Sequence, residues 1–276
     1  MTKAEQTSFQ TTDGLTLNAL EWAVKDPIAH LSIVHGLGEH IGRYAHVASF
    51  YNTKGISVSG LDLRGHGLSE GPRGYAPSLD QLHKDLTAFI KNSKSNDAPK
   101  VLYGHSMGGN LVLSYLMNAK NPMDFKCCIA TSPWIKLVEE PVVFLKLAAK
   151  VLNKFGGFTR PNELDTAAIS SIEEEVEKYI ADPLVHDKVS SVCALAIMNS
   201  GEDLINSKKK FPIPLLINHG TGDRITSHLG SQKFFDNQAN EKIALKLWDD
   251  MYHELHNDRE REALFKHCYE WIIEHI

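Results

Sequence analysis

Long hydrophobic stretches are absent from this sequence. None of its apolar runs approaches the ~20 residues that a membrane-spanning helix needs. The first six residues are polar and contain no apolar segment of the kind that directs secretion. We therefore expect a cytoplasmic protein, and we leave open whether it contacts membranes peripherally.

Cysteine is also scarce. No two of the four cysteines show the C-x-x-C spacing of a redox or zinc motif. Two are adjacent in a strand-like run, so their side chains should point to opposite faces of a sheet. We expect free thiols in a reducing compartment at all four positions, which are Cys127, Cys128, Cys193 and Cys268.

Long runs of one charge sign are absent from the chain. The 29 basic and 34 acidic residues are mixed, and the net charge is −5. No basic stripe is interleaved with aromatic residues, so we expect no nucleic-acid partner. The short run at residues 208–210, three lysines, favours a solvated loop.

Histidine is plentiful, with 14 residues, but most are scattered singly. His253 and His256 are three positions apart, whereas the H-E-x-x-H zinc motif places two histidines four apart on one helix face. No third ligand is evident. We therefore expect neither a metal nor another cofactor.

Strand-like and helix-like segments alternate along most of the chain, which predicts βαβ units and a mostly parallel sheet flanked by helices. Residues 7–10 and 15–22 favour an antiparallel pair at the edge of that sheet. The remaining strands are expected at residues 30–34, 55–62, 101–103, 127–131, 213–219 and 244–248, and helices at 42–54, 79–94, after 109, and at 258–275.

This alternation stops after Trp134 and resumes at Ile213. Residues 141–184, between these points, have helical character and show no strand run. We predict an α/β fold whose core consists of residues 1–132 and 211–276. Residues 133–210 are expected to form an inserted, mainly helical cap.

Residues 104–108 have the pattern G-x-S-x-G between a strand-like run and a helix-like one. A serine nucleophile stands on a tight strand-to-helix turn, and flanking glycines let neighbouring backbone approach it. Ser106 also falls at a helix N-terminus, where free N–H groups favour negative charge. A chance match in a loop is the alternative, but the context and the additional Gly109 favour a nucleophile.

A serine nucleophile needs a histidine to accept its proton and a carboxylate to orient that histidine. Asp223 lies on a glycine-bracketed loop after the strand at 213–219, although an ordinary turn aspartate is the alternative. His253 is the first histidine after the strand at 244–248, and His256 is its competitor. Two further candidates for the acid, which come one strand later than expected, are Asp249 and Asp250.

The reaction also needs two backbone N–H donors for the negatively charged oxygen of the intermediate. One is expected from the residue after the nucleophile, Met107. The other is expected from the glycine-rich loop after the strand at 30–34, where Leu37 is the natural donor.

Eight short segments match the motifs of a known family, in the family's order and over nearly the whole chain. They are residues 35–44, 62–71, 104–109, 132–133, 147–152, 182–184, 220–224 and 252–256. Together they resemble the monoacylglycerol lipases and lysophospholipase-like hydrolases of the α/β-hydrolase fold. The resemblance implies a triad of Ser106, Asp223 and His253, with Leu37 and Met107 as oxyanion donors. The family commonly has alanine where Leu37 stands, so the mouth of the acyl site is expected to differ.

The resemblance also implies contacts with the glycerol end of the substrate from Glu39, Arg43, His105, Tyr179 and His256. Such groups can hydrogen-bond two free hydroxyls. A structural role is the alternative, in which His105 supports the serine turn and Glu39 pairs with Arg43. The segment at residues 62–71 is expected to shape a loop beside the site, with no catalytic role.

Residues 142–155 are apolar over most of a helix, and their lysines recur every four residues in one narrow stripe. Such a helix can cover the acyl site with its lysines in water. It can also contact a membrane surface with its apolar side down. Because lipid substrates are found in membranes or micelles, contact of this helix with a membrane would serve a purpose.

We therefore expect a serine esterase that cleaves monoacylglycerols, with a lipid ester as its partner. A lysophospholipase or a short-chain carboxylesterase would use the same triad. A non-catalytic binding protein of this fold usually lacks a triad residue, and all three are present. A peptidase is disfavoured because the cap shows no clear acidic pair for a free amine.

Overall fold

The computed structural model describes residues 3–94, 97–119, 124–140, 157–238 and 240–276. Its centre is an eight-stranded sheet in the order β1-β2-β4-β3-β5-β6-β9-β10. Strands β1 and β2 form the predicted antiparallel pair at one edge, and β2 is also antiparallel to β4. All other neighbours are parallel. The strands are β1 (Glu5–Gln10), β2 (Thr16–Trp22), β3 (Ala29–Val34), β4 (Ile56–Leu61), β5 (Lys100–His105), β6 (Phe125–Thr131), β9 (Leu215–Gly220) and β10 (Ile243–Trp248).

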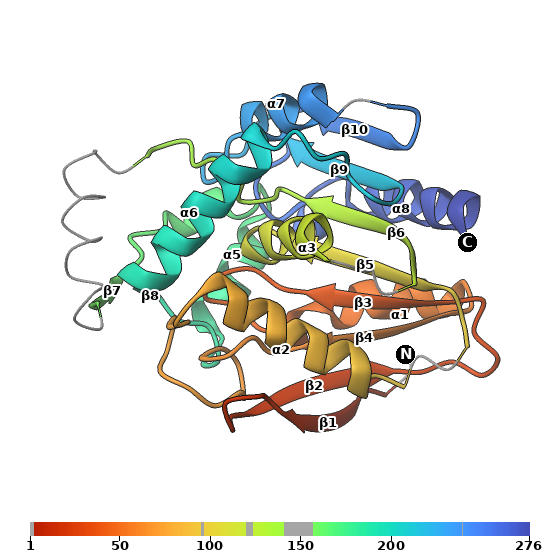
Figure 1. The fold of residues 1–276 in the computed structure, drawn as a ribbon, viewed down its shortest axis with the longest axis horizontal. Helices are drawn as coiled ribbons and strands as arrows, with labels where there is room; N and C mark the ends of the chain where they lie inside the picture. Colours follow the sequence, from red (N-terminus) through yellow and green to blue (C-terminus); the bar gives the residue numbers. More distant parts are fainter. Residues whose placement is uncertain (1–2, 95–96, 120–123, 141–156, 239) are drawn as a thin grey trace.

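Helices cover both faces of the sheet, as Figure 1 shows. On one face lie α2 (Leu79–Asn92), α3 (Met107–Asn118), α6 (Ser191–Asn206) and α7 (His228–Gln238), and on the other lie α1 (Ala45–Thr53) and α8 (Arg261–His275). Each face has its own hydrophobic core. Cys128 belongs to the first core and Cys127 to the second, so the prediction of opposite faces is confirmed. All four cysteines are buried and free.

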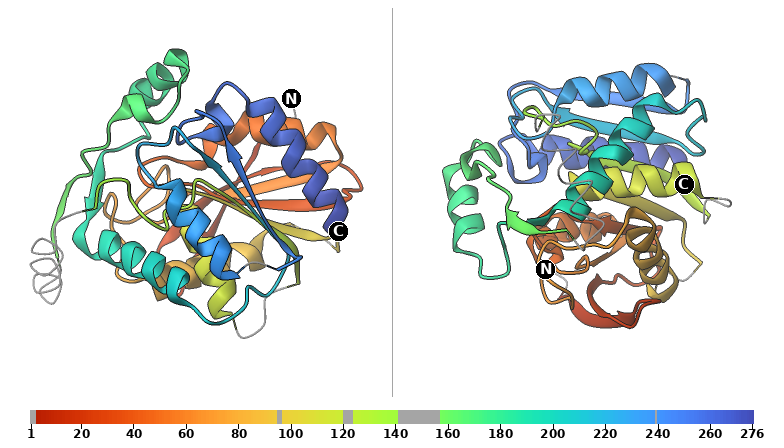
Figure 2. Two further views of the ribbon diagram at one scale, coloured as in Figure 1. Left: turned by 90° about the horizontal axis from the view of Figure 1, so that it is seen from above. Right: turned by 60° about the vertical axis from the view of Figure 1, so that its left-hand side comes forward.

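Between β6 and β9 the chain leaves the eight-stranded sheet. This stretch contains α5 (Glu173–Ala181) and a small antiparallel pair, β7 (Thr159–Pro161) with β8 (Lys188–Ser190). Figure 2 shows α5 and β7 standing to one side of the sheet. The expectation that residues 141–184 contain no strand is therefore wrong at β7. A three-residue strand is too short for side-chain alternation to reveal it.

Helix α7 was not expected from the sequence either. Its buried residues are Gly230, Ser231, Phe234 and Gln238, of which only one is strongly apolar. A helix with so weak an apolar face gives little periodic signal. The predicted cap helix at 142–155 lies outside the described residues, so its contact with a membrane stays a prediction. Among the helices that are described, none combines the length and apolar character required to span a bilayer.

Buried ion pairs and hydrogen bonds hold the loop after β4, at residues 62–71, against the core. Arg64 is 4% exposed and donates to Asp85 of α2 at 2.5 and 2.8 Å and to Asp13 at 2.9 and 3.0 Å. Asp62 accepts from the Ile41 N–H at 2.8 Å and the Leu68 N–H at 2.9 Å. These contacts fix the segment at 62–71 beside the loop that follows β3.

Removing the charge of Arg64 should be costly because it leaves the fully buried Asp85 carboxylate without its partner. We expect Arg64→Met to lower the free energy of unfolding by about 3 kcal/mol, measured by urea denaturation. Lys84→Met is the matched control, since Lys84 forms an exposed pair with Asp80 of the same helix. Equal stability losses in the two variants would contradict this account.

Candidate active site

Ser106 occupies a strained turn between β5 and α3. Its backbone has φ 53° and ψ −118°, a region that non-glycine residues rarely adopt. A Cβ atom on Gly104 would lie 2.4 Å from the Gly108 carbonyl oxygen, and one on Gly108 would lie 2.2 Å from that of Val34. Glycine is therefore required at both positions of the motif, because β3, β5 and α3 meet there at backbone distance.

Three side chains from the ends of different strands form one hydrogen-bonded row. His253 Nε2 lies 2.9 Å from Ser106 Oγ, and His253 Nδ1 lies 2.7 Å from Asp223 Oδ2. Because Nδ1 faces a carboxylate, it carries the proton, and Nε2 is left to accept from the serine. The competitor His256 does not reach the serine in this way, and Asp249 and Asp250 are exposed.

The Asp223 carboxylate is almost completely enclosed. Its Oδ1 accepts from the N–H groups of Ile225 at 2.8 Å and Thr226 at 3.0 Å. Burial alone would raise the pKa of Asp223, but the neighbouring imidazoles and their hydrogen bonds lower it well below its ordinary value. Burial alone would lower the pKa of His253, but the adjacent Asp223 charge raises it above its ordinary value.

The two expected oxyanion donors belong to chain segments that adjoin Ser106. Leu37 follows Gly36, whose N–H donates to Glu39 Oε1 at 2.6 Å. Met107 is the first residue of α3. Within the part of the chain that is described, neither the Leu37 N–H nor the Met107 N–H has a hydrogen-bond acceptor.

The residues expected to contact glycerol lie together, and several are paired with one another. Arg43 donates to Glu39 at 2.8 Å and to both oxygens of Glu254 at 2.6 and 2.7 Å. The Arg43 guanidinium also lies over the Tyr179 ring of α5, 4.7 Å from its centre. Burial would raise the pKa of Glu39, but chiefly Arg43 lowers it to about 2. The alternative expected from the sequence, a pair between Glu39 and Arg43, is thus present.

Two buried histidines lie near both this charged cluster and the serine. The His105 ring lies 4.8 Å from the rings of both His253 and His256, and His256 stacks on Tyr44 at 4.6 Å. Burial lowers the pKa of His105 to about 3 and that of His256 well below its ordinary value. Both rings are therefore neutral at pH 7. Among the described residues, neither nitrogen of His256 has a partner.

Three residues of the site were missed by reading the sequence. Thr226 donates to Asp223 at 2.9 Å, His219 lies 3.2 Å from the same carboxylate oxygen, and Glu254 holds Arg43. His219 carried one available signal, since it stands near the end of the strand before Asp223. Glu254 carried none, because its partner is 211 positions away in the sequence.

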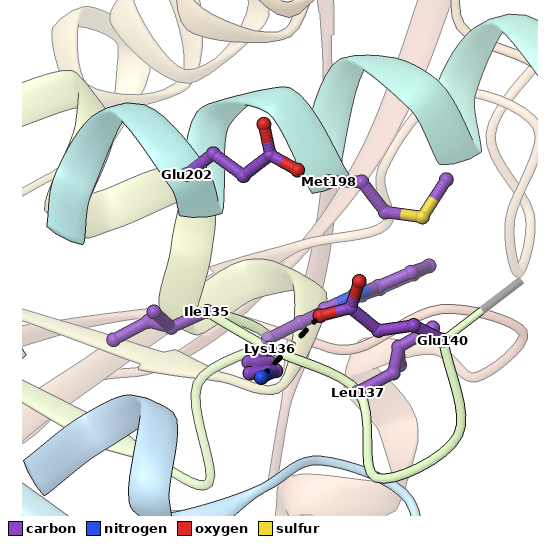
Figure 3. Close-up of a pocket in the computed structure, with 7 residues that line it drawn as sticks. Ile135, Lys136, Leu137, Glu140, Met198 and Glu202 are labelled. Carbon is purple, nitrogen blue, oxygen red and sulfur yellow. Dashed lines mark ion pairs between the residues drawn. The ribbon is translucent and has the colours of Figure 1, made fainter. Parts of the chain in front are cut away.

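A small cavity lies beside the segment that follows β6. Figure 3 shows Met198 and Glu202 of α6 facing Ile135, Leu137 and an ion pair across it. The cavity measures about 20 Å³, and the pair joins Lys136 to Glu140 at 3.8 Å. Its wall is connected to the site, because the Trp134 N–H donates to the Ser106 carbonyl at 2.9 Å. Among the described residues, no group of three or more His, Cys, Asp or Glu side chains is placed to hold a metal ion.

The raised pKa of His253 predicts where activity appears on a pH scale. The imidazole accepts a proton only when it is neutral, so activity should rise as pH increases through its pKa. We expect the acid limb of kcat/KM for a nitrophenyl ester to have its midpoint above 6.5, the ordinary value for histidine. A midpoint clearly below 6.5 would contradict the assignment of Asp223 as its partner.

Comparison with known proteins places this geometry in a family. The family model described as "Serine aminopeptidase, S33" matches residues 25–260. A monoacylglycerol lipase of Mycolicibacterium smegmatis is 32% identical over 91% of this chain and 90% of its own length. An uncharacterized abhydrolase domain-containing protein of Dictyostelium discoideum is 39% identical over 96% of this chain, which spans 28% of that relative's length.

The crystal structure of a monoacylglycerol lipase from Paleococcus ferrophilus shares this fold. It is 28% identical, has a TM-score of 0.84, and the match covers 99% of this chain and 100% of the other. The predicted α/β-hydrolase fold and the resemblance on which it was based are confirmed. The chain therefore belongs to the α/β-hydrolase family described as serine aminopeptidase, S33, and is related to monoacylglycerol lipases over most of its length.

Proposed function

We propose that this chain is a serine hydrolase that cleaves monoacylglycerols to fatty acid and glycerol through an acyl-enzyme on Ser106. The observation that carries the proposal is the continuous row from Ser106 Oγ through the His253 imidazole to Asp223 Oδ2, at 2.9 and 2.7 Å. The names of the Mycolicibacterium and Paleococcus relatives support the choice of substrate.

In this proposal Ser106 Oγ attacks the ester carbonyl while His253 Nε2 takes its proton. Asp223 stabilises the imidazolium that forms and holds the ring in place. The Leu37 and Met107 N–H groups bind the oxyanion. The intermediate collapses as His253 returns the proton to the departing glycerol oxygen, and water then releases the fatty acid by the same steps.

The alcohol end of the substrate is assigned to the side of the site that carries Glu39 and the two neutral histidines. A Cβ atom on Gly36 would lie 2.9 Å from Glu39 Oε1 and 3.1 Å from Ser106 Cβ, so the carboxylate and the nucleophile are close neighbours. Both nitrogens of the buried His256 lack a hydrogen-bond partner within the described structure, which leaves one donor and one acceptor unsatisfied on this side of the site.

We further propose that the insertion at residues 133–210 supplies a cap on a core formed by residues 1–132 and 211–276, except for its helix α6, which packs on the sheet as part of the core. Tyr179 of α5 supports the proposal, because it lies over Arg43 of the core.

A phospholipase is the competing function, since a phospholipase of Bacillus subtilis is 28% identical over 89% of this chain. One observation favours a neutral alcohol instead. Arg43, the cation beside the serine, is already held by the two carboxylates of Glu39 and Glu254. Two carboxylates and one guanidinium leave a net negative charge, which would repel a phosphate group at this position.

The direct test is a panel of substrates with wild type, Ser106→Ala and Ser132→Ala. We expect selective cleavage of a long-chain monoacylglycerol over the matching di- and triacylglycerols and a lysophospholipid. Ser106→Ala should reduce kcat at least about 10³-fold. Ser132→Ala is the matched control, because Ser132 is a buried serine near the site whose Oγ lacks a partner among the described residues.

Activity on a short nitrophenyl ester alone would retain the nucleophile and reject the lipase assignment. Equal rates for wild type and Ser106→Ala would reject the mechanism itself.

The net negative charge of Glu39, Glu254 and Arg43 leads to a separate prediction. Glu254→Gln removes one negative charge from the cluster and should raise the rate on lysophosphatidate relative to that on monoacylglycerol by about tenfold. Each rate is divided by that on a neutral nitrophenyl ester, which corrects for any effect on the neighbouring His253. An unchanged ratio would show that Glu254 does not select against anionic substrates.

A further inference from the structure

His219 contacts the same carboxylate oxygen that orients His253. It lies near the carboxyl end of β9 and is fully buried. Its Nε2 is 3.2 Å from Asp223 Oδ2 and 3.1 Å from the Thr226 carbonyl oxygen. Its Nδ1 is 2.7 Å from Ser231 Oγ of α7. Two imidazoles, those of His219 and His253, thus contact Asp223 Oδ2.

The protonation of the His219 ring follows from these partners. Nε2 faces a carboxylate and a carbonyl, and both accept hydrogen bonds only, so Nε2 carries a hydrogen. In the neutral ring Nδ1 then accepts from the Ser231 hydroxyl, which can act as a donor. Ser231 therefore selects the tautomer in which His219 donates to Asp223.

The other side-chain donor to this oxygen is already shared. The Thr226 hydroxyl has one hydrogen, but two acceptors face it, Asp223 Oδ2 at 2.9 Å and the Ser132 carbonyl oxygen at 3.1 Å. A buried carboxylate needs donors to remain ionised and to keep one orientation. His219 supplies a donor on a rigid ring, fixed from the strand on one side and from α7 on the other.

We propose that His219 is a positioning residue for the hydrolysis, whose Nε2–H fixes the Asp223 carboxylate toward His253 and limits the proton affinity of the His253–Asp223 pair. The inference rests on the proposed function, because it assigns a role relative to the same three residues. Donors to a carboxylate stabilise its charge and weaken its attraction for the proton on the facing imidazole.

Other titratable groups surround the pair and must stay unchanged in the test. His228 of α7 lies 6.4 Å from the His219 ring, between ring centres. The groups that interact with His253 or Asp223 from other positions are His105, His256, Glu39 and Glu254. None of them is altered in the variants below.

The experiment compares the pH dependence of kcat/KM for wild type, His219→Leu and His219→Gln on a nitrophenyl ester. Loss of the donor in His219→Leu should move the acid limb up by roughly 0.5 to 1 pH unit, the effect of one hydrogen bond. His219→Gln retains an N–H donor, so its acid limb should lie close to that of wild type. The remaining displacement should be only a small fraction of the shift in His219→Leu. A residue that only supports packing would lower the rate equally at every pH.

Coincident acid limbs for His219→Leu and wild type would overturn the inference, as would equal shifts in both variants. Ser106→Ala is measured alongside, and full activity in that variant would overturn the proposed function and this inference together. Inactive Ser106→Ala with an unmoved limb in His219→Leu would overturn this inference alone.

A second measurement determines the His219 tautomer in the wild-type protein directly. A ¹⁵N-histidine spectrum of the wild-type protein, with His219 assigned by its loss in His219→Gln, reports which ring nitrogen carries hydrogen. The expected result is a protonated Nε2 and a bare Nδ1. A protonated Nδ1 with a bare Nε2 would overturn the inference, because His219 would then have no hydrogen to donate to Asp223.

Discussion

The geometry of the site depends on one steric constraint, the contact of three backbone segments around Ser106. The loop after β3, the end of β5 and the start of α3 approach so closely that side chains on Gly36, Gly104 or Gly108 would collide with neighbouring atoms. The strained serine is held by its own backbone bonds. Its N–H donates to Thr131 at 3.0 Å, and its carbonyl accepts from Asn110 at 3.0 Å and Trp134 at 2.9 Å. These bonds offset a backbone strain of about 1–3 kcal/mol.

Around this turn the protein buries charge and compensates it locally. Asp223 is satisfied by two backbone N–H groups, two imidazoles and a hydroxyl. Arg43 is satisfied by two carboxylates. Since every donor is placed before a substrate arrives, little reorganisation is needed when charge develops on the ester. The same pairing joins the loop after β3 to the loop after β10, because Glu254 follows His253 directly.

Much of the fold was readable from the sequence, for one physical reason. Parallel strands end at a common edge, so residues that follow separate strand-like runs are brought together even when far apart in the chain. That rule predicted that Ser106, Asp223 and His253 would meet, and the geometry has them in one hydrogen-bonded row. Their catalytic roles, like those of Leu37 and Met107, remain a proposal. The sequence was silent on α7 because its buried face is mostly polar or small. It gave no signal for Glu254, and for His219 only a position near the end of a strand, because a buried polar side chain is identified by its partner and those partners depend on the fold.

The central claim is that the strained serine is the nucleophile of an intact hydrolase site. The most direct measurement is labelling with a fluorophosphonate, which reacts covalently with activated serines, followed by peptide mapping by mass spectrometry. The account predicts a single adduct, on the peptide that contains Ser106, and loss of that adduct in His253→Ala. An adduct on another residue, or no adduct in the folded wild-type protein, would contradict it.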